Sequence, residues 1–261
     1  MFMDRLFTIK AYLRYRLKAR HREGFGIHSP FVYSLLNEVI YEKSHYYCYK
    51  PIEKLRQELL NNKEQISVED FGEGHYKLRS IASIAKKSVK PAKYAQLLFR
   101  LVNMNSSRTI LELGTALGIT TAYLASAHTQ AQVITIEGDS LLCNYAQTHF
   151  KRLKKQNISL QCGKLDDLLP DLLAPIDQLD FVFFDANHTK EATLRYAEWC
   201  FPKTHTGTIF VVDDIHWSAS MEEAWHVIKQ DKRVRLAIDI FEMGILFFNT
   251  ELTKQEYTVA F

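Results

Sequence analysis

The order of apolar and polar positions along this 261-residue chain becomes regular beyond about residue 80. From there, short apolar runs typical of buried strands alternate with longer segments of helical spacing. Strands are predicted at 108–113, 132–137, 157–161, 179–184 and 206–212, and helices at 91–104, 118–128, 140–154, 165–173, 189–200 and 219–230. Strands that alternate with helices need crossover connections, which predicts a mostly parallel sheet with helices on both faces.

The end of the chain departs from this alternation. RLAIDIF and GILFFN, around residues 235–249, are two β-rich runs separated only by Glu242 and Met243. A link this short cannot make a parallel crossover, so the two runs are expected to pair antiparallel. We therefore predict a doubly wound α/β fold, whose seven-stranded, mostly parallel sheet ends in an antiparallel hairpin.

Residues 1–80 are predicted to form an N-terminal helical extension or cap, and residues 81–261 the main domain. Pro30 is expected to open one helix of this extension, and HYYCYKPIEKLRQELLNNK contains another. The segment at 66–80, ISVEDFGEGHYKLRS, is rich in Gly and charge and is expected to be a loop. This loop and the aromatic 24–50 region are expected to build the ligand pocket over the carboxyl edge of the sheet.

Composition places the chain among ordinary globular proteins, with 47% hydrophobic and 24% charged residues. The four cysteines form neither a C-x-x-C pair nor a zinc spacing, which predicts reduced, buried thiols and a cytoplasmic location. They are Cys48, Cys143, Cys162 and Cys200. We expect neither a signal peptide nor a transmembrane segment, because no apolar run approaches about 18 residues.

Positive charge is concentrated at the start of the chain. Residues 1–22 carry seven Lys and Arg against Asp4 alone, a net charge of +6, whereas the whole chain carries +3, which leaves −3 for the remainder. Apolar residues recur there at helical spacing and predict an amphipathic basic helix: Phe2, Leu6, Ile9, Leu13 and Leu17. The preferred role is packing of this stripe on the main domain or on a sister subunit, as in a homodimer. An anionic membrane surface and nucleic-acid phosphates are the other partners considered.

The stretch TILELGTALGITTAYLA, at 109–125, runs from a strand into a helix across Gly114 and Gly118. Glycines allow a ligand to approach the backbone closely. Both the dinucleotide fingerprint G-x-G-x-x-G and the phosphate-binding pattern G-x-x-x-x-G-K-[ST] are absent. Because the carboxylate of Glu112 precedes the glycines, we expect the loop to disfavour phosphates and to accept a cation or an ammonium-bearing ligand.

Further acids follow at the carboxyl ends of the next two strands. Glu137 stands about 20 residues beyond the glycine loop, where an acid of nucleoside-binding α/β folds accepts hydrogen bonds from ribose hydroxyls. Asp166 and Asp167 follow the next strand. One of them is placed to accept a hydrogen bond from an adenine amino group, but both are equally suited to stabilising a helix N-terminus.

The segments LDFVFFDANH and TIFVVDDIHW each deliver carboxylates to the end of a buried strand. The first supplies Asp185, and the second supplies Asp213 and Asp214. If three carboxylates meet at one edge of the sheet, they form either a cluster of like charge or a cation site. Oxygen ligands favour magnesium, calcium or manganese.

These motifs, in their order, resemble those of the S-adenosylmethionine-dependent O-methyltransferases of the catechol and caffeoyl-coenzyme A type and their bacterial relatives. The resemblance covers roughly residues 85–250 and rests on ELGTALGITT, TIEGD, GKLDDLLPDL, FFDANH and VVDDIHW. It implies a class I methyltransferase fold and S-adenosylmethionine as cofactor, with Thr120 at the methionine carboxylate. The cofactor-binding residues that it implies are Glu112, Gly114, Thr115, Gly118, Thr120, Glu137, Asp166 and Asp185.

The resemblance also implies magnesium or another divalent cation bound by Asp185, Asp213 and Asp214. Asp214 stands where the family has an asparagine, so the chain departs from the family pattern at this ligand. Asp185 and His188 are the predicted catalytic residues, and His188 falls where the family places a lysine base. An imidazole titrates near neutrality and suits the removal of a hydroxyl proton. His216 is a second candidate base.

The implied activity is O-methylation of a small, phenol-like hydroxyl compound, by direct transfer of the methyl group from the sulfonium. One alternative is an RNA methyltransferase that binds through the basic N-terminal helix. The net negative charge of the remaining chain argues against it. Another alternative is a non-catalytic S-adenosylmethionine-binding protein, which the retained site residues argue against.

Overall fold

The computed structural model describes residues 2–19, 26–70 and 75–261 of the chain. Its contacts separate two compact units: unit 1 comprises Met1–Lys43 and Pro170–Phe261, and unit 2 comprises Ser44–Leu169. Both ends of the chain therefore belong to unit 1. The domain boundary near residue 80 stays a prediction, because this division separates the chain at other positions.

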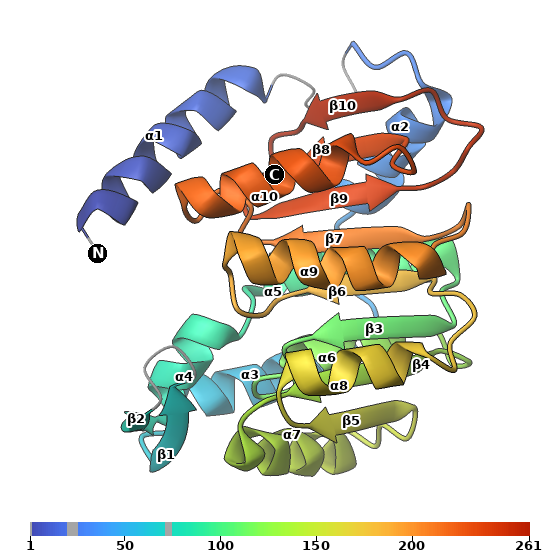
Figure 1. Ribbon diagram of the computed structural model, residues 1–261. Helices are drawn as coiled ribbons and strands as arrows, with labels where there is room; N and C mark the ends of the chain where they lie inside the picture. The colour runs from blue at the N-terminus through green and yellow to red at the C-terminus, as the bar shows by residue number, and fades with distance from the viewer. Residues whose placement is uncertain (1, 20–25, 71–74) are drawn as a thin grey trace. The chain divides into compact units, whose positions relative to one another are not determined.

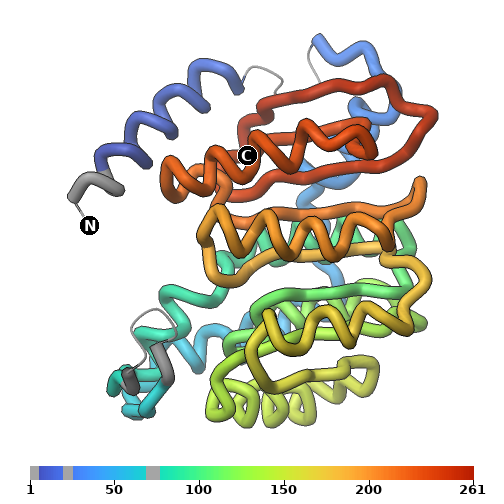
Figure 2. Tube along the Cα trace, in the orientation of Figure 1, coloured from blue at the N-terminus to red at the C-terminus, as the bar shows by residue number. Residues whose placement is uncertain are grey.

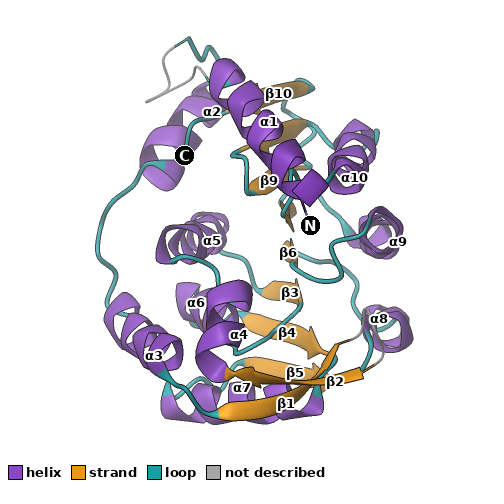
Figure 3. Cartoon of the chain, turned by 90° about the vertical axis from the view of Figure 1, so that its left-hand side faces the viewer, coloured by secondary structure: helices purple, strands orange, loops and turns teal. Residues whose placement is uncertain are grey.

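Unit 2 is built on three parallel strands. They are β3 (Thr109–Leu113), β4 (Gln132–Glu137) and β5 (Ile158–Cys162), with β4 in the middle. The helices α5 and α6 lie on one face of these strands (Figure 3). The helices of unit 2 are α3 (Tyr49–Asn61), α4 (Ile81–Ser88), α5 (Ala92–Asn105), α6 (Ile119–Ala127) and α7 (Ser140–Arg152), and α8 (Leu165–Leu173) continues into unit 1. Except for α4, these helices and the three strands were predicted from the sequence.

The segment expected to be a loop at 66–80 is instead an antiparallel hairpin. Its strands are β1 (Gln65–Asp70) and β2 (His75–Ser80). Ile66 and Val68 are buried while Ser67 between them is exposed, which is the alternation of a half-buried strand. The loop prediction gave too much weight to the Gly-rich turn, whose residues 71–74 lie outside the described part of the chain.

The described part of unit 1 contains five strands, which follow one another in the order β6, β7, β9, β8, β10 (Figure 1). They are β6 (Phe181–Phe184), β7 (Ile209–Asp213), β8 (Leu236–Asp239), β9 (Met243–Phe247) and β10 (Gln255–Thr258). β6 is parallel to β7, whereas β9 is antiparallel to both β7 and β8. The predicted antiparallel hairpin is therefore confirmed. The strand β10, which pairs parallel with β8, was not predicted.

Helices cover both faces of the unit 1 strands (Figure 3). On one face lie α9 (Lys190–Cys200) and α10 (Ala219–Gln230). The opposite face carries α2 (Pro30–Leu35), which continues as the π-helical turn η2 (Leu36–Ile40). The short helix η3 (Phe201–Lys203) directly follows α9. Pro30 opens α2 as predicted, and the Ser29 hydroxyl caps the helix by accepting from the Val32 amide.

The predicted basic helix forms α1 (Phe2–Lys18) and packs within unit 1, beside the C-terminal part of the chain (Figure 2). From Leu6 onward, its buried residues are Ala11 and Tyr15, and the Tyr15 hydroxyl donates to the Val259 carbonyl at 2.6 Å. The helix therefore packs within unit 1, but the predicted packing of its apolar stripe is wrong, since Leu6, Ile9, Leu13 and Leu17 are exposed. The side chain of Phe2, and all of Arg20 and Arg22, lie outside the described part of the chain.

One prediction about the cysteines is wrong. Cys143 of α7 and Cys162 of β5 form a disulfide, while Cys48 and Cys200 are free and buried. The bonded residues are separated by 19 positions, so no short motif links them, and only the packing of α7 on β5 brings their Cα atoms to 6.2 Å, a distance suited to a disulfide. None of the described helices is both long and apolar enough to cross a membrane.

Candidate active site

The loop between β3 and α6 turns through three residues with left-handed backbone. Their φ angles are 102° at Gly114, 45° at Ala116 and 76° at Gly118. A Cβ added at Gly118 would lie 2.6 Å from the ring of Phe150 on α7. Glycine is therefore required at position 118 by the packing of the loop as well as by its backbone angle.

Backbone hydrogen bonds hold this loop in place within unit 2. The amides of Gly114 and Thr115 both donate to the carbonyl of Ile136 on β4, at 3.1 and 3.2 Å. The Leu117 carbonyl lies 2.9 Å from His149 Nδ1. Because burial lowers the pKa of His149, the ring is neutral near pH 7 and its Nδ1–H donates this bond. The loop is thus held by hydrogen bonds within unit 2.

Glu137 ends β4, as predicted, and links the loop to the following helix. Its Oε2 accepts from the amide of Ala116 at 2.8 Å, and its Oε1 accepts from the amide of Asp139 at 3.0 Å. Burial raises the pKa of Glu137, and these amide hydrogen bonds oppose the rise. Each carboxylate oxygen has a second lone pair, so this side chain has the capacity to accept two ligand hydroxyls without releasing the loop.

Glu112 has a completely buried side chain within unit 2. Its Oε2 accepts from the hydroxyls of Thr121 at 2.5 Å and Thr135 at 2.7 Å, and the Thr135 hydroxyl lies 2.6 Å from that of Thr115. Burial raises the pKa of Glu112 to about 7, and the charge of Glu137 adds to the rise. Oε1 accepts no hydrogen bond from the described residues, so it retains acceptor capacity that suits a ligand N–H group.

Two further predicted cofactor positions lie at the starts of helices. Thr120 is the second residue of α6 and is buried, where the free amides of a helix N-terminus favour an anion. Asp166 and Asp167 are exposed in the first turn of α8. This place fits both roles that the sequence left open for these acids, adenine recognition and stabilisation of the helix N-terminus.

Unit 1 holds a group of three candidate metal ligands: Asp185, His188 and Asp213. Each offers one ligand atom, and these atoms lie within 4.8 Å of one another. Asp213 is the buried last residue of β7, and Asp185 directly follows β6. His188 Nε2 lies 3.6 Å from Asp185 Oδ1, and its Nδ1 lies 3.7 Å from Asp214 Oδ2. The imidazole thus takes the place in the ligand group that the sequence analysis gave to Asp214.

The backbone beside this group adopts angles that are rare for residues other than glycine. The φ angle is 61° at Asn187, 34° at His188 and 54° at Asp214. The Asp214 amide donates to the carbonyl of Glu242 at 2.7 Å, which fixes this turn. Such conformations cost about 1–3 kcal/mol each and concentrate at functional sites, which supports a functional role for the group.

His216, the second candidate base, is occupied elsewhere in unit 1. Its Nε2 lies 2.8 Å from Asp239 Oδ2, and its ring stacks on Phe241 with centroids 5.4 Å apart. Its Nδ1 is 3.6 Å from the carboxylate of Glu222. This buried histidine therefore holds its loop against β8 and α10. Its acidic partners follow it in the chain by 6 and 23 residues, at separations that no motif marks.

The donor set in unit 1 fits a divalent cation. Two carboxylates and one imidazole are ligands that manganese, iron and zinc accept, whereas magnesium prefers oxygen ligands alone. The presence of His188 in the group therefore moves the expected ion away from magnesium and toward a first-row transition metal.

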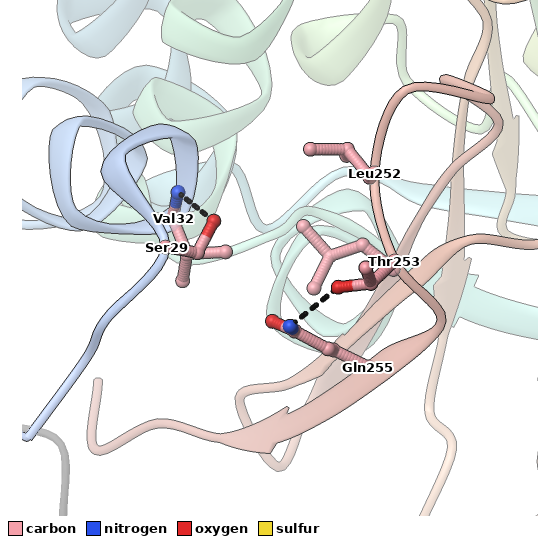
Figure 4. Close-up of a pocket in the computed structure, with 6 residues that line it drawn as sticks. Ser29, Val32, Leu252, Thr253 and Gln255 are labelled. Carbon is pink, nitrogen blue, oxygen red and sulfur yellow. Dashed lines mark hydrogen bonds between the residues drawn. The ribbon is translucent and has the colours of Figure 1, made fainter.

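The structure also has a small pocket of about 20 Å³ within unit 1 (Figure 4). It is lined by Ser29, Val32, Leu236, Leu252, Thr253 and Gln255. Its polar side chains bond to neighbours, since Ser29 caps α2 and the Gln255 amide donates to the Thr253 hydroxyl. It contains none of the predicted site residues and is smaller than the roughly 300 Å³ of a typical ligand site.

Residues 111–215 match a methyltransferase domain. The matched segment begins in β3 and contains the glycine loop, Glu137, Asp185, His188 and Asp213. In addition, the chain is 32% identical over 133 residues to the catechol O-methyltransferase of Niastella koreensis, an alignment that covers 49% of this chain and 58% of that protein. The chain thus spans little more than half the length of this relative.

Solved structures share the fold over most of the chain. The O-methyltransferase from Bacillus cereus in complex with SAH has a TM-score of 0.56 and 18% identity, covering 83% of this chain and 96% of that one. The O-methyltransferase TomG from Streptomyces achromogenes, in complex with SAM, has a TM-score of 0.58 and 17% identity, covering 88% and 99%. The predicted doubly wound α/β fold and the resemblance to methyltransferases are both confirmed.

Proposed function

We propose that this chain is an S-adenosylmethionine-dependent O-methyltransferase whose acceptor is a small, phenol-like hydroxyl compound of the catechol type. The observation that carries this proposal is the organised loop after β3. Glu137 accepts from a loop amide, and buried Glu112 keeps one carboxylate oxygen available behind the loop. The match of this segment to a methyltransferase domain and the catechol O-methyltransferase of Niastella koreensis support the choice of reaction.

Unit 2 would bind the cofactor, which supplies a methyl group already activated on its sulfonium. Glu137 would accept hydrogen bonds from the ribose hydroxyls, and Thr120 would bind the carboxylate at the start of α6. Glu112 Oε1 would accept a hydrogen bond from the ammonium group. The remaining cofactor residues of this proposal in unit 2 are Gly114, Thr115, Gly118 and Asp166, whereas Asp185, which the resemblance also implies, belongs to unit 1.

Unit 1 would prepare the acceptor hydroxyl. Asp185, His188 and Asp213 would hold a divalent cation, which when bound supplies a Lewis acid that favours the deprotonated hydroxyl. Asp214, 3.7 Å from His188 Nδ1, would orient the imidazole. If no cation takes part, His188 is the general base, because it is the partly exposed imidazole of the group.

The alternatives have no observation in their favour. The RNA methyltransferase depends on the basic N-terminal helix, which the proposed reaction does not need. The non-catalytic binding protein depends on the cofactor-site residues, which the proposed reaction already uses. A cytoplasmic location stays a prediction, and the disulfide between Cys143 and Cys162 removes the support that four free thiols gave it.

Calorimetric titration with S-adenosylhomocysteine tests the cofactor site. Glu137→Gln replaces a charged acceptor and should weaken binding about tenfold or more, since a hydrogen bond to a charged group contributes about 1.5–3 kcal/mol. Glu58→Gln is the matched control, because this carboxylate pairs with Arg152 on the surface of the same unit. Equal affinity of the wild type and Glu137→Gln would remove the ribose assignment, and no binding by the wild type would remove the proposed function.

Turnover of catechol with labelled S-adenosylmethionine tests the acceptor site. We expect excess chelator to abolish methylation, and manganese to restore it better than magnesium because of the imidazole ligand. Asp213→Asn should lose metal-dependent activity, whereas Asp214→Asn should retain most of it. Full activity in chelator would eliminate the metal and leave His188 as the base.

A further inference from the structure

The described contacts of α1 with the rest of unit 1 come from one side of the helix. The Thr8 hydroxyl donates to the Trp217 carbonyl at 3.3 Å, and Arg14 forms an ion pair with Glu222 of α10 at 2.7 Å. The rings of Tyr12 and Tyr15 contact Phe241 at 5.0 and 5.2 Å. Several independent contacts therefore fix the rotation of α1 about its own axis.

This rotation presents an apolar stripe to the solvent. The exposed fractions are 48% at Leu6, 57% at Ile9, 59% at Leu13 and 74% at Leu17. Their spacing of three or four residues places all four on one side of the helix, opposite the buried Ala11 and Tyr15. We call these four residues the outer stripe. An amphipathic helix normally packs its most apolar side against its own domain, whereas α1 exposes this side to solvent.

Basic side chains border the outer stripe. Lys10 and Arg16 are exposed on its two sides, and Lys18 is exposed near the end of α1. The outer stripe itself contains no acid, and the whole segment 1–22 carries a net charge of +6 in a chain of net charge +3.

We propose that the outer stripe is a docking surface for an anionic lipid membrane, on which α1 lies parallel to the surface. An apolar seam bordered on both sides by Lys and Arg inserts its side chains between the acyl chains while the cations meet lipid phosphates. The helix has 17 residues and is not apolar enough to span a bilayer, which agrees with an interfacial position. Trp217, 58% exposed beside Thr8, adds an aromatic side chain of the kind enriched at membrane surfaces.

The charge on α1 argues against two other occupants. A second copy of the chain would bring two strongly basic helices together, and their repulsion would oppose the burial of the stripe. Nucleic acid would neutralise the cations but would leave four large apolar side chains in water. An anionic membrane satisfies both features at once.

Flotation of the full chain with vesicles tests this proposal. Vesicles of phosphatidylcholine with phosphatidylglycerol should carry the protein, vesicles of phosphatidylcholine alone should carry much less, and added salt should release it. The double variant Ile9→Ser/Leu13→Ser should lose binding about tenfold or more through lost apolar insertion, and Lys10→Glu/Arg16→Glu through lost charge attraction. Leu78→Ser is the matched control, since Leu78 is 71% exposed on β2 of the other unit.

Circular dichroism and the urea midpoint establish that each variant is folded, which is expected because the altered side chains are exposed. The proposal is overturned if the wild type does not float with phosphatidylglycerol vesicles, or if Leu78→Ser loses as much binding as the stripe variant. It is also overturned if ultracentrifugation finds a dimer that Ile9→Ser/Leu13→Ser dissociates, because a second copy then occupies the stripe.

Discussion

Glu112→Gln tests whether the buried acid behind the glycine loop titrates near neutral pH. The change keeps the shape of the side chain and keeps one oxygen to accept from Thr121 and Thr135. It removes the charge, and it places an amide group where Oε1 accepts no bond from the described residues. The free energy of unfolding of the variant therefore differs from that of the wild type in two ways. One contribution, from the lost charge, depends on pH, and the other, from packing of the amide, does not.

The term that depends on pH follows from the pKa of Glu112. Burial raises this pKa from 4.5 to about 7, so the folded chain holds a proton that the unfolded chain releases between these values. The stabilisation that this proton gives is complete below about pH 4.5 and is lost as the pH rises to about 7. A rise from 4.5 to about 7 corresponds to about 3.5 kcal/mol, at about 1.4 kcal/mol per pKa unit. The Gln variant has no such loss.

The assay is urea unfolding of both proteins without cofactor at several pH values from 5 to 8. The free energy of unfolding of Glu112→Gln minus that of the wild type should rise with pH, by up to about 3 kcal/mol, whatever the constant cost of the amide. Glu58→Gln is the control. Its pairing with Arg152 lowers the pKa of Glu58, so its contribution is in place above the ordinary pKa and should not change between pH 5 and 8. Parallel profiles for Glu112→Gln and the wild type would refute a raised pKa at Glu112.

Three shorter predictions concern the same unit. Gly118→Ala should lower the free energy of unfolding by about 2–3 kcal/mol, because it combines left-handed strain with a collision with Phe150, and an unchanged urea midpoint would contradict this. Thiol titration of the denatured chain should find two free thiols without reductant and four after reduction; four without reductant would contradict the disulfide between Cys143 and Cys162. Reduction of that disulfide should lower the free energy of unfolding by about 3 kcal/mol in the wild type but not in Cys143→Ser, since the loop that it closes spans about 20 residues.

The parts of the fold that the sequence predicted well are those where local pattern and tertiary contacts agree. Four of the five residues of β3 are buried, so its apolar pattern is strong, and β4 has the predicted bounds. The acids that follow strands were found because parallel strands end at one edge, as with Glu137 and Asp185. The grouping of His188 with Asp185 and Asp213 was harder to predict, because it depends on left-handed backbone at Asn187 and His188, which residues other than glycine rarely adopt.

The hydrogen bonds of Glu112 show a second limit of sequence reasoning. From the sequence alone, this acid is expected to lie beside the turn and to face a ligand. In the structure Thr121 and Thr135, which lie 9 and 23 residues further along the chain, occupy one of its oxygens. Two hydroxyl groups from different elements meet a carboxylate only in the folded chain, so the raised pKa of Glu112 has no counterpart in the local sequence.

The wrong choice of face for α1 has a physical cause outside the helix itself. The chain after β10 carries backbone groups that need partners when they are buried. The Tyr15 hydroxyl donates to the Val259 carbonyl and accepts from the Phe261 amide, and the Tyr41 hydroxyl donates to the Ala260 carbonyl. A helix face with tyrosines satisfies these groups, whereas a face of leucine and isoleucine has no hydrogen-bond donor to offer. Hydrophobicity alone therefore predicts the wrong buried face of α1. Because the backbone groups after β10 need hydrogen-bond partners, the tyrosine face is buried, and the apolar side of the helix is left exposed and available to a membrane.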